Sequence, residues 1–388
     1  MIFFRMKIWR ESVLGILVGL GLAWGLPEVM GQVDVVGSGK ISVDVSGVSE
    51  AGGLQARMVR LLRTTMMLTP TRSEETRYGI SGRLVEERVE GTLEDRVTGR
   101  RMFSRSYPGG LTIGAGRFAD DVLEAITGVK GFMGSEIAFI SADTGFKELC
   151  VAAIDGGRAR RLTNDRSISN APAWSPDGRR IAYTSYRLGY PDVYVVNLDT
   201  MQRTRVAYFN GLNSGAAFSP DGWRLALTLS RDGNPEIYVM NVGGGGEQRL
   251  TRTRGTETSP RWSPDGRRIV FSSDDRGTPQ LYIMNLGGGG VQRLVTGYSY
   301  NTEPDWSPDG KRIAFTVRQG GVFSIAVYEI DGAQTAVMCV GESPSWTRNS
   351  RHLVFSRGGQ LYILDTETKQ TQRIDVGLTK CTEPAVSR

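Results

Sequence analysis

The sequence predicts a mainly β fold, a six-bladed β-propeller preceded by a small α/β domain. A segment that reads APAWSPDGRRIAYTS from Ala171 recurs along the C-terminal two-thirds of the 388-residue chain. Short extended segments separated by turns fill each copy, and the last residues of the chain restate the start of a copy. Six copies at this spacing indicate a propeller or another array of repeated units.

The repeat is clearest in the first apolar residue after its turn. The steps between successive copies are four of 44 residues and one of 40, at Ile137, Ile181, Leu225, Ile269, Ile313 and Leu353. Alternating and β-branched residues bounded by turns are typical of strands, so each repeat is predicted to form a four-stranded blade. In the copy from Ala171 these strands are expected at Ala171–Ser175, Arg180–Ser185, Asp192–Leu198 and Arg203–Tyr208.

Two features of the repeat have a structural explanation. Proline, aspartate and glycine suit a tight turn in the motif Ser-Pro-Asp-Gly, which recurs at residues 175–178, 219–222, 263–266 and 307–310. An aromatic residue precedes the turn at Trp174, Phe218, Trp262, Trp306 and Trp346. We expect these rings to pack between adjacent blades rather than to serve catalysis, because a feature found in every blade serves geometry.

The end of the chain predicts how the ring closes. Thr382–Ser387 restates the segment that precedes the turn in other repeats, and Glu136–Ile140 supplies the matching remainder. We therefore assign residues 131–388 to the propeller and expect its C-terminal strand to complete the first blade, which leaves no free sheet edge. A closed ring needs no partner subunit, so a monomer is expected.

Residues 32–130 lack the repeat and are assigned to the small α/β domain. Their periodicity predicts one strand, two helices and two extended runs. In chain order these are Lys40–Val45 (strand), Leu54–Leu68 (helix), around Tyr78–Glu90 and Arg100–Tyr107 (extended), and Arg117–Thr127 (helix).

Residues 1–31 are typical of an export signal peptide. The apolar stretch Val13–Leu26 follows the basic residues Arg5, Lys7 and Arg10, and we expect cleavage after Gly31. The stretch is short for a membrane span, and a retained membrane anchor is the alternative.

Composition argues against several function classes. The chain has 47 Lys and Arg against 41 Asp and Glu, but no run of basic residues interleaved with aromatics indicates nucleic-acid binding. Cys150, Cys339 and Cys381 follow no metal-ligand or CxxC spacing. We expect buried free thiols, with an approach of Cys150 to Cys381 as the alternative, and no metal or cofactor.

Two segments, together with the repeats, give the chain a resemblance to a known family. Residues 118–131 read FADDVLEAITGVKG, and residues 301–310 read NTEPDWSPDG. The chain resembles the TolB family, whose members join a small α/β domain to a six-bladed propeller. The resemblance implies a non-catalytic role in the periplasmic Tol–Pal system of Gram-negative envelopes, which supports outer-membrane integrity and cell division. One departure is Trp346–Ser350, which replaces Ser-Pro-Asp-Gly in the sixth repeat.

The resemblance also implies partners, and the membrane is reached only through them. In the family, the mouth of the propeller channel receives the peptidoglycan-associated lipoprotein Pal, and the N-terminal extension contacts the inner-membrane protein TolA. The matching mouth positions are Asn170, Leu212, Asn213, Ser214, Gly215, Glu257, Thr258, Thr302, Glu303, Ser343, Thr382 and Glu383. The matching N-terminal positions are Gln32, Val33, Asp34, Val35, Val36, Gly37, Ser38 and Gly39.

The residue types agree with these roles but leave alternatives open. Loops that enter the inner strands of a propeller form a ring of short polar groups, and such a ring can bind a protruding loop. The alternative is that these residues only satisfy turn backbone or face solvent. The N-terminal segment can add a strand to a partner's sheet, fold back on the propeller, or form the first strand of the α/β domain.

An exported propeller hydrolase or lyase is the rival function. The chain has one histidine, His352, expected to be a surface or strand residue, and no GxSxG motif with a triad partner. No acidic spacing selects a carboxylate pair that acts on sugars. Gly243–Gly246 and Gly287–Gly290 precede strands, so they are read as turns rather than phosphate cradles. A propeller that binds a different envelope partner is the third reading.

Overall fold

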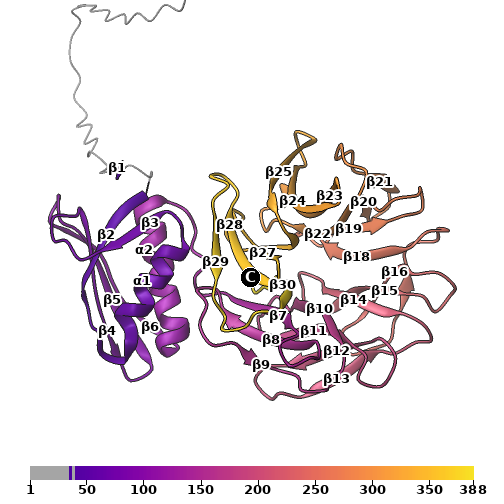
Figure 1. The fold of residues 1–388 in the computed structure, drawn as a ribbon, viewed down its shortest axis with the longest axis horizontal. Helices are drawn as coiled ribbons and strands as arrows, with labels where there is room; N and C mark the ends of the chain where they lie inside the picture. Colours follow the sequence, from indigo (N-terminus) through magenta and orange to yellow (C-terminus); the bar gives the residue numbers. More distant parts are fainter. Residues whose placement is uncertain (1–34, 37–39) are drawn as a thin grey trace, which may run out of the picture. The chain divides into compact units, whose positions relative to one another are not determined.

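The structure is a computed structural model that describes residues 35–36 and 40–388 (Figure 1). The predicted signal peptide, residues 1–31, and residues 32–34 and 37–39 of the N-terminal segment lie outside the described residues. In the described part an α/β domain precedes six four-stranded sheets, which confirms the predicted fold class. No helix in this part is long and apolar enough to cross a membrane.

The α/β domain is a twisted sheet with two helices on one face (Figure 1). The central strand β2 runs parallel to β3 and β4, whereas the remaining pairs are antiparallel. Its strands are β1 (Val35–Val36), β2 (Lys40–Val48), β3 (Leu68–Thr71), β4 (Tyr78–Val85), β5 (Arg88–Asp95) and β6 (Arg100–Pro108). Its helices are α1 (Leu54–Thr64) and α2 (Ala115–Thr127), preceded by the short turns η1 (Ala51–Gly53) and η2 (Gly110–Gly114).

Two elements of this domain differ from the sequence prediction. The helix expected to reach Leu68 ends at Thr64, because the Thr65 hydroxyl accepts hydrogen bonds from the Leu68 and Met67 amides at 3.0 and 3.1 Å and turns the chain into β3. The single extended run around Tyr78–Glu90 is two strands, β4 and β5. Hydrophobic alternation continues across their tight turn, where Glu86 has φ 54°, so periodicity alone does not locate the turn.

The first three blades follow the order expected for four-stranded units. Blade 1 comprises β30 (Cys381–Val386), β7 (Glu136–Ser141), β8 (Glu148–Ala153) and β9 (Arg160–Arg161). Blade 2 comprises β10 (Ser169–Trp174), β11 (Arg180–Ser185), β12 (Asp192–Asn197) and β13 (Arg203–Ala207). Blade 3 comprises β14 (Asn213–Phe218), β15 (Arg224–Leu229), β16 (Glu236–Asn241) and β17 (Gln248–Arg249).

The other three blades repeat this arrangement. Blade 4 comprises β18 (Glu257–Trp262), β19 (Arg268–Ser273), β20 (Gln280–Asn285) and β21 (Val291–Arg293). Blade 5 comprises β22 (Asn301–Trp306), β23 (Arg312–Gln319), β24 (Val322–Glu329) and β25 (Gln334–Val340). Blade 6 comprises β26 (Glu342–Trp346), β27 (His352–Arg357), β28 (Gln360–Asp365) and β29 (Thr371–Ile374).

The last strand of the chain lies beside the first strand of the propeller. β30 pairs antiparallel with β7, from Cys381 opposite Ser141 to Val386 opposite Ile137 (Figure 1). The inner strands β10, β14, β18, β22, β26 and β30 contact one another in sequence, and β30 also contacts β10. The six inner strands therefore form a closed ring.

The aromatic residue before each turn links neighbouring blades. The indole nitrogen of Trp262 donates to the carbonyl of Ala217 in blade 3 at 3.2 Å, and that of Trp174 donates to the carbonyl of Ala385 in blade 1 at 2.9 Å. Both acceptors lie on the inner strand of the preceding blade. The rings thus fill the space between twisted sheets and fix the spacing of the blades.

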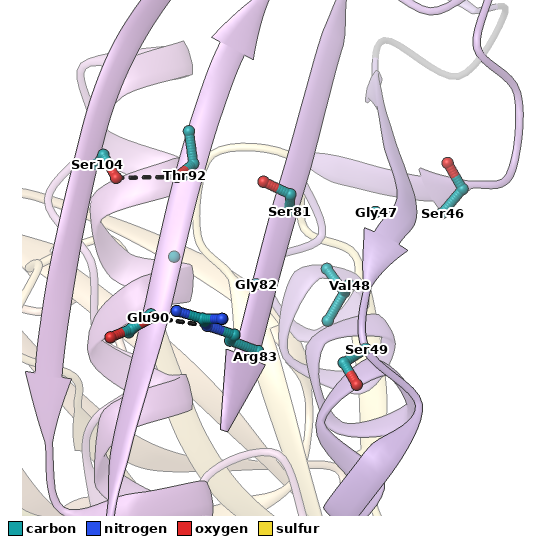
Figure 2. A pocket seen from close by; sticks show the side chains of 11 residues that line it. Ser46, Gly47, Val48, Ser49, Ser81, Gly82, Arg83, Glu90, Thr92 and Ser104 are labelled. Carbon is teal, nitrogen blue, oxygen red and sulfur yellow. Dashed lines mark hydrogen bonds and ion pairs between the residues drawn. The ribbon is translucent and has the colours of Figure 1, made fainter. Parts of the chain in front are cut away.

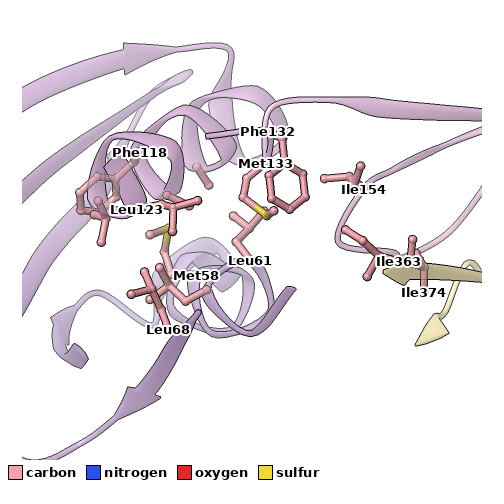
Figure 3. Packing of buried hydrophobic residues seen from close by; sticks show 14 of the residues in the cluster. Met58, Leu61, Leu68, Phe118, Leu123, Phe132, Met133, Ile154, Ile363 and Ile374 are labelled. Carbon is pink, nitrogen blue, oxygen red and sulfur yellow. The ribbon is translucent and has the colours of Figure 1, made fainter. Parts of the chain in front are cut away.

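One hydrophobic core runs from the α/β domain into blades 1 and 6 (Figure 3). Met58, Leu61 and Phe118 of the two helices belong to the same buried cluster as Ile154 of blade 1 and Ile363 of blade 6. The linker residues Phe132 and Met133 lie between these groups in the same cluster (Figure 3). Because shared apolar burial stabilises both parts, the α/β domain is packed on the propeller rather than tethered to it.

The unusual turn of the sixth repeat contacts the α/β domain. Arg348 forms an ion pair with Asp120 of α2, and its Nε donates to the carbonyl of Gly131 at 2.9 Å. Asp120 also accepts the amide of Met133 at 2.6 Å. Burial raises the pKa of Asp120 to about 6, against the effect of the nearby Arg348. The departure from Ser-Pro-Asp-Gly therefore has a structural reason, because this turn contacts the α/β domain through Arg348.

His352 is a second polar contact at this junction. It lies on β27 and is fully buried, and its ring stacks on Phe132 with 4.5 Å between centroids. Nε2 lies 3.1 Å from the carbonyl of Thr65, and Nδ1 lies 3.1 Å from the side-chain amide of Asn349. Burial lowers the pKa of His352 to about 4. A neutral ring that donates from Nε2 and accepts at Nδ1 satisfies both partners.

We expect His352→Gln to destabilise the protein less at pH 5 than at pH 7.5. Because the folded-state pKa is depressed, the stability that neutral His352 contributes is complete above about pH 6.5 and is lost as pH falls towards 4. The difference in free energy of unfolding between wild type and variant should shrink by about 2 kcal/mol, as measured by urea unfolding. A difference that stays constant between the two pH values would contradict this assignment.

Candidate functional site

Every inner strand contains the same backbone irregularity. A residue near the start of the strand, the third in five blades and the second in blade 6, has φ between 50° and 66°, at Ala171, Gly215, Ser259, Glu303, Ser343 and Glu383. The pairing register shifts at this point in all six blades. A left-handed residue other than glycine costs about 1 kcal/mol or more, so its recurrence shows that the ring requires the bulge. We call these six residues the bulge positions.

The twelve mouth residues predicted from the sequence lie at or just before these bulges. They belong to all six blades, on the first three residues of the inner strands or, for Leu212, immediately before β14. Several link one blade to the next. Glu383 accepts the amide of Ala171 at 2.6 Å, and Glu303 accepts the amide of Ser343 at 3.0 Å.

Two of the twelve predicted mouth residues have fully buried side chains that bond to other parts of the protein. Asn213 is fully buried, and its amide donates to the carbonyls of Phe209 and Pro191 at 2.8 and 3.0 Å, which holds the loop before β14. Glu257 is also fully buried and accepts hydrogen bonds from the hydroxyls of Ser273 and Thr253. These two side chains therefore support the loops and strands of the mouth and do not face its opening. The other ten residues are half-buried.

In blades 1, 2, 4 and 5 the residue before the bulge has unused polar groups, whereas in blade 3 the Ser214 hydroxyl accepts a hydrogen bond from Thr184 at 3.3 Å. In the part of the chain that the structure describes, the hydroxyls of Thr258, Thr302 and Thr382 have no hydrogen-bond partner, and the Oδ1 of Asn170 is buried without one. The neighbouring bulge residue Glu303, in contrast, is bonded to Thr316 and Ser343. A partner that enters the mouth thus meets free hydroxyls on blades 1, 4 and 5.

The mouth is acidic. Burial raises the pKa of Glu383, and the nearby Glu303 carboxylate adds to the shift. The same two causes raise the pKa of Glu342, which precedes the bulge of blade 6. Mutual repulsion of carboxylates in a partly dry site favours a bound group that supplies positive charge or hydrogen-bond donors.

We expect Glu257→Gln to stabilise the protein relative to wild type above pH 7. Burial and, to a smaller extent, the neighbouring Glu236 raise the pKa of Glu257 to about 7. The stability that protonated Glu257 contributes is complete below its unfolded pKa and is lost as pH rises through the folded value. The midpoint of urea unfolding should rise in the variant at pH 8 and match wild type near pH 5, with exposed Glu124→Gln as control. An equal midpoint at pH 8 would show that Glu257 is ionised without cost.

At their other ends the inner strands line a cavity of about 370 Å³ that contains none of the twelve predicted residues. Sequence reasoning missed this cavity, because its charged residues have no counterpart in the other repeats. Among the described residues, no group of three His, Cys, Asp or Glu side chains could hold a metal ion. Cys150, Cys339 and Cys381 are free thiols, and Cys150 and Cys381 are buried.

A shallow groove of about 550 Å³ lies on the open face of the α/β sheet (Figure 2). Small residues such as Ser81, Thr92 and Ser104 form its floor, and the Arg83–Glu90 ion pair at 2.7 Å lies beside them (Figure 2). Gly91 also lines the groove; a Cβ there would meet the ring of Phe118, so this glycine allows α2 to pack closely.

The fold is that of a six-bladed β-propeller with an attached α/β domain. The family model described as the TolB β-propeller domain matches residues 123–388. This is more than half of the chain, and the chain belongs to the TolB β-propeller family. The crystal structure of TolB from Acinetobacter baumannii has 26% sequence identity and a TM-score of 0.82, covering 90% of this chain and 96% of that one.

Curated relatives match over a shorter part of the chain. The Tol-Pal system protein TolB of Syntrophotalea carbinolica is 43% identical over 94 residues, 24% of this chain and 22% of that protein. The protein TolB homolog of Chlorobium chlorochromatii is 40% identical over 93 residues, 23% of this chain and 21% of that protein. The chain thus aligns with about a fifth of the length of these relatives.

Proposed function

We propose that this chain is a periplasmic, non-enzymatic protein-binding component of a Tol–Pal envelope system. Family membership supports this proposal, as does the similarity to the Tol-Pal system protein TolB of Syntrophotalea carbinolica. The observation that carries it is a set of three hydroxyls without an intramolecular partner, at Thr258, Thr302 and Thr382 on the inner strands of blades 4, 5 and 1. Unpaired polar groups around one mouth suit recognition of another protein.

The mouth is the proposed docking site for the peptidoglycan-associated lipoprotein Pal. A protruding loop of the lipoprotein would supply donors to Glu303, Glu342 and Glu383 and accept from the threonine hydroxyls. The bulges favour this arrangement, because a left-handed residue interrupts the ladder and exposes backbone groups next to the side chains. Entry of a loop would remove these groups from water, so each hydrogen bond would matter to specificity.

The N-terminal segment, residues 32–39, is the proposed contact for a TolA-like inner-membrane protein. Its described part, Val35–Val36, pairs with Lys40 and Ile41 of β2 as a two-residue strand. This pairing is equally expected if the segment only forms the first strand of the α/β domain. By binding both Pal and a TolA-like inner-membrane protein, the chain would connect the two membranes and so support outer-membrane integrity and cell division.

We expect Thr302→Val to weaken binding of purified Pal by about 10-fold, because loss of one hydrogen bond in a dry interface costs about 1 to 2 kcal/mol. Thr302 has no intramolecular partner, so the substitution should leave the fold unchanged. Thr204→Val, on the exposed outer strand β13, is the matched control. The affinity is measured by isothermal titration calorimetry with the soluble domain of Pal.

Two outcomes would overturn parts of the proposal. Equal affinity of wild type and Thr302→Val would remove the mouth assignment while leaving the partner. Absence of binding between the wild-type chain and Pal would remove the partner, and the reading as a propeller for a different envelope protein would replace it.

A further inference from the structure

The cavity at the turn side of the ring has a wall of unusual composition. Seven prolines line it, from the inner strands and from the Ser-Pro-Asp-Gly turns, together with Trp174, Phe218 and Trp262. Prolines carry no backbone N–H, so this wall offers apolar contact and few hydrogen-bond donors. We call this space the turn-side cavity.

Two of the three charged residues that line the turn-side cavity come from one position of the repeat, and the third is Arg388. Two residues after the bulge, three blades have alanine, at Ala173, Ala217 and Ala385, whereas blade 4 has Arg261 and blade 5 has Asp305. The geometry of the ring does not need a charge here, because half of the blades form it with a methyl group. Arg261 and Asp305 therefore call for a separate explanation.

Asp305 already has its partners. Its carboxylate forms an ion pair with Arg388 and accepts the amide of Trp346 at 2.8 Å. Arg261 has fewer polar partners than Asp305. Within the described residues its guanidinium donates only to the carbonyl of the adjacent Pro260, at 3.1 Å, and no carboxylate pairs with it.

The position of Arg261 is energetically unfavourable for a charged side chain. Arg261 is half-buried and lines the cavity, and burial lowers the pKa of its guanidinium even with Asp305 nearby. A desolvated cation without a carboxylate partner is unfavourable unless something compensates for it. With Arg388 balanced by Asp305, the side chains of the cavity leave one positive charge unmatched.

We propose that the turn-side cavity binds a ligand in which an apolar group carries a single carboxylate, with the carboxylate on Arg261. The planar guanidinium forms paired hydrogen bonds with a carboxylate, and the proline and aromatic wall takes the apolar part. A saccharide acid would leave its hydroxyls unpaired against this wall. A volume of about 370 Å³ suits a group of one or two residues. The carboxylate can come from an acidic side chain in a peptide or from a peptide C-terminus.

The test uses the full-length mature chain and three short probes in calorimetric titrations. Ac-Leu-Glu-NH2 carries a side-chain carboxylate, Ac-Leu-Leu-OH carries a terminal carboxylate, and Ac-Leu-Gln-NH2 is the neutral control. At least one carboxylate probe should bind about 10-fold or more tightly than the neutral one. The probe that binds more tightly identifies the source of the carboxylate.

The matched variant is Arg261→Ala, which places in blade 4 the residue that blades 1, 2 and 3 already have at this position. It should fold and should lose about 10-fold or more in affinity for the carboxylate probe. Arg267→Ala, an exposed arginine in the same blade, removes the same charge and should bind as wild type. Thr302→Val, at the opposite mouth, should also bind as wild type, which separates this site from the proposed docking of Pal.

Three results would overturn the inference. They are equal affinity for the glutamate and glutamine probes, wild-type affinity in Arg261→Ala, and absence of binding by either carboxylate probe up to about 10 mM.

Discussion

The antiparallel pairing of β30 with β7 is the contact on which the rest of the structure depends. It joins residues from opposite ends of the propeller sequence, such as Cys381 and Ser141, and gives blade 1 its fourth strand. Without it, blade 1 would present an unpaired edge, and the inner strands of blades 6 and 2 would lack a common neighbour. Closure also brings the bulge positions into one ring, so both the polar mouth and the turn-side cavity exist only because this pairing forms. The entropy of closing so long a loop grows slowly with its length, which the many contacts of a full ring can offset.

Residues that repeat and residues that depart from the repeat have different roles in this chain. The aromatic residue before the turn and the left-handed bulge recur and set the geometry of the ring. Departures coincide with contacts to something else. The replaced turn of blade 6 places Arg348 on Asp120 of the α/β domain, and Arg261 replaces alanine where the cavity has an unmatched charge. In a repeat protein, a residue that breaks the pattern is therefore the place to look for binding.

Much of the fold could be predicted because its signals occur six times. The period and the shared first blade follow from a pattern that recurs in six copies, and the turns follow from a motif that is present in four of them. The bulges could not be predicted, since Ala171 and Glu303 carry no sequence signal for positive φ. The mouth positions could be placed on inner strands, but the burial of Asn213 and Glu257 depends on neighbouring loops that a pattern does not describe. The junction is a similar case, because His352 meets Thr65 only after both domains have folded.

Hydrogen exchange of the native protein tests the closure of the ring most directly. If β30 and β7 form one sheet within a cooperative unit, amides of residues 381–386 exchange as slowly as those of β14 and β18, because all of them open only when the ring unfolds. Exchange in residues 381–386 that is orders of magnitude faster than in those strands would show an open first blade and would contradict the account.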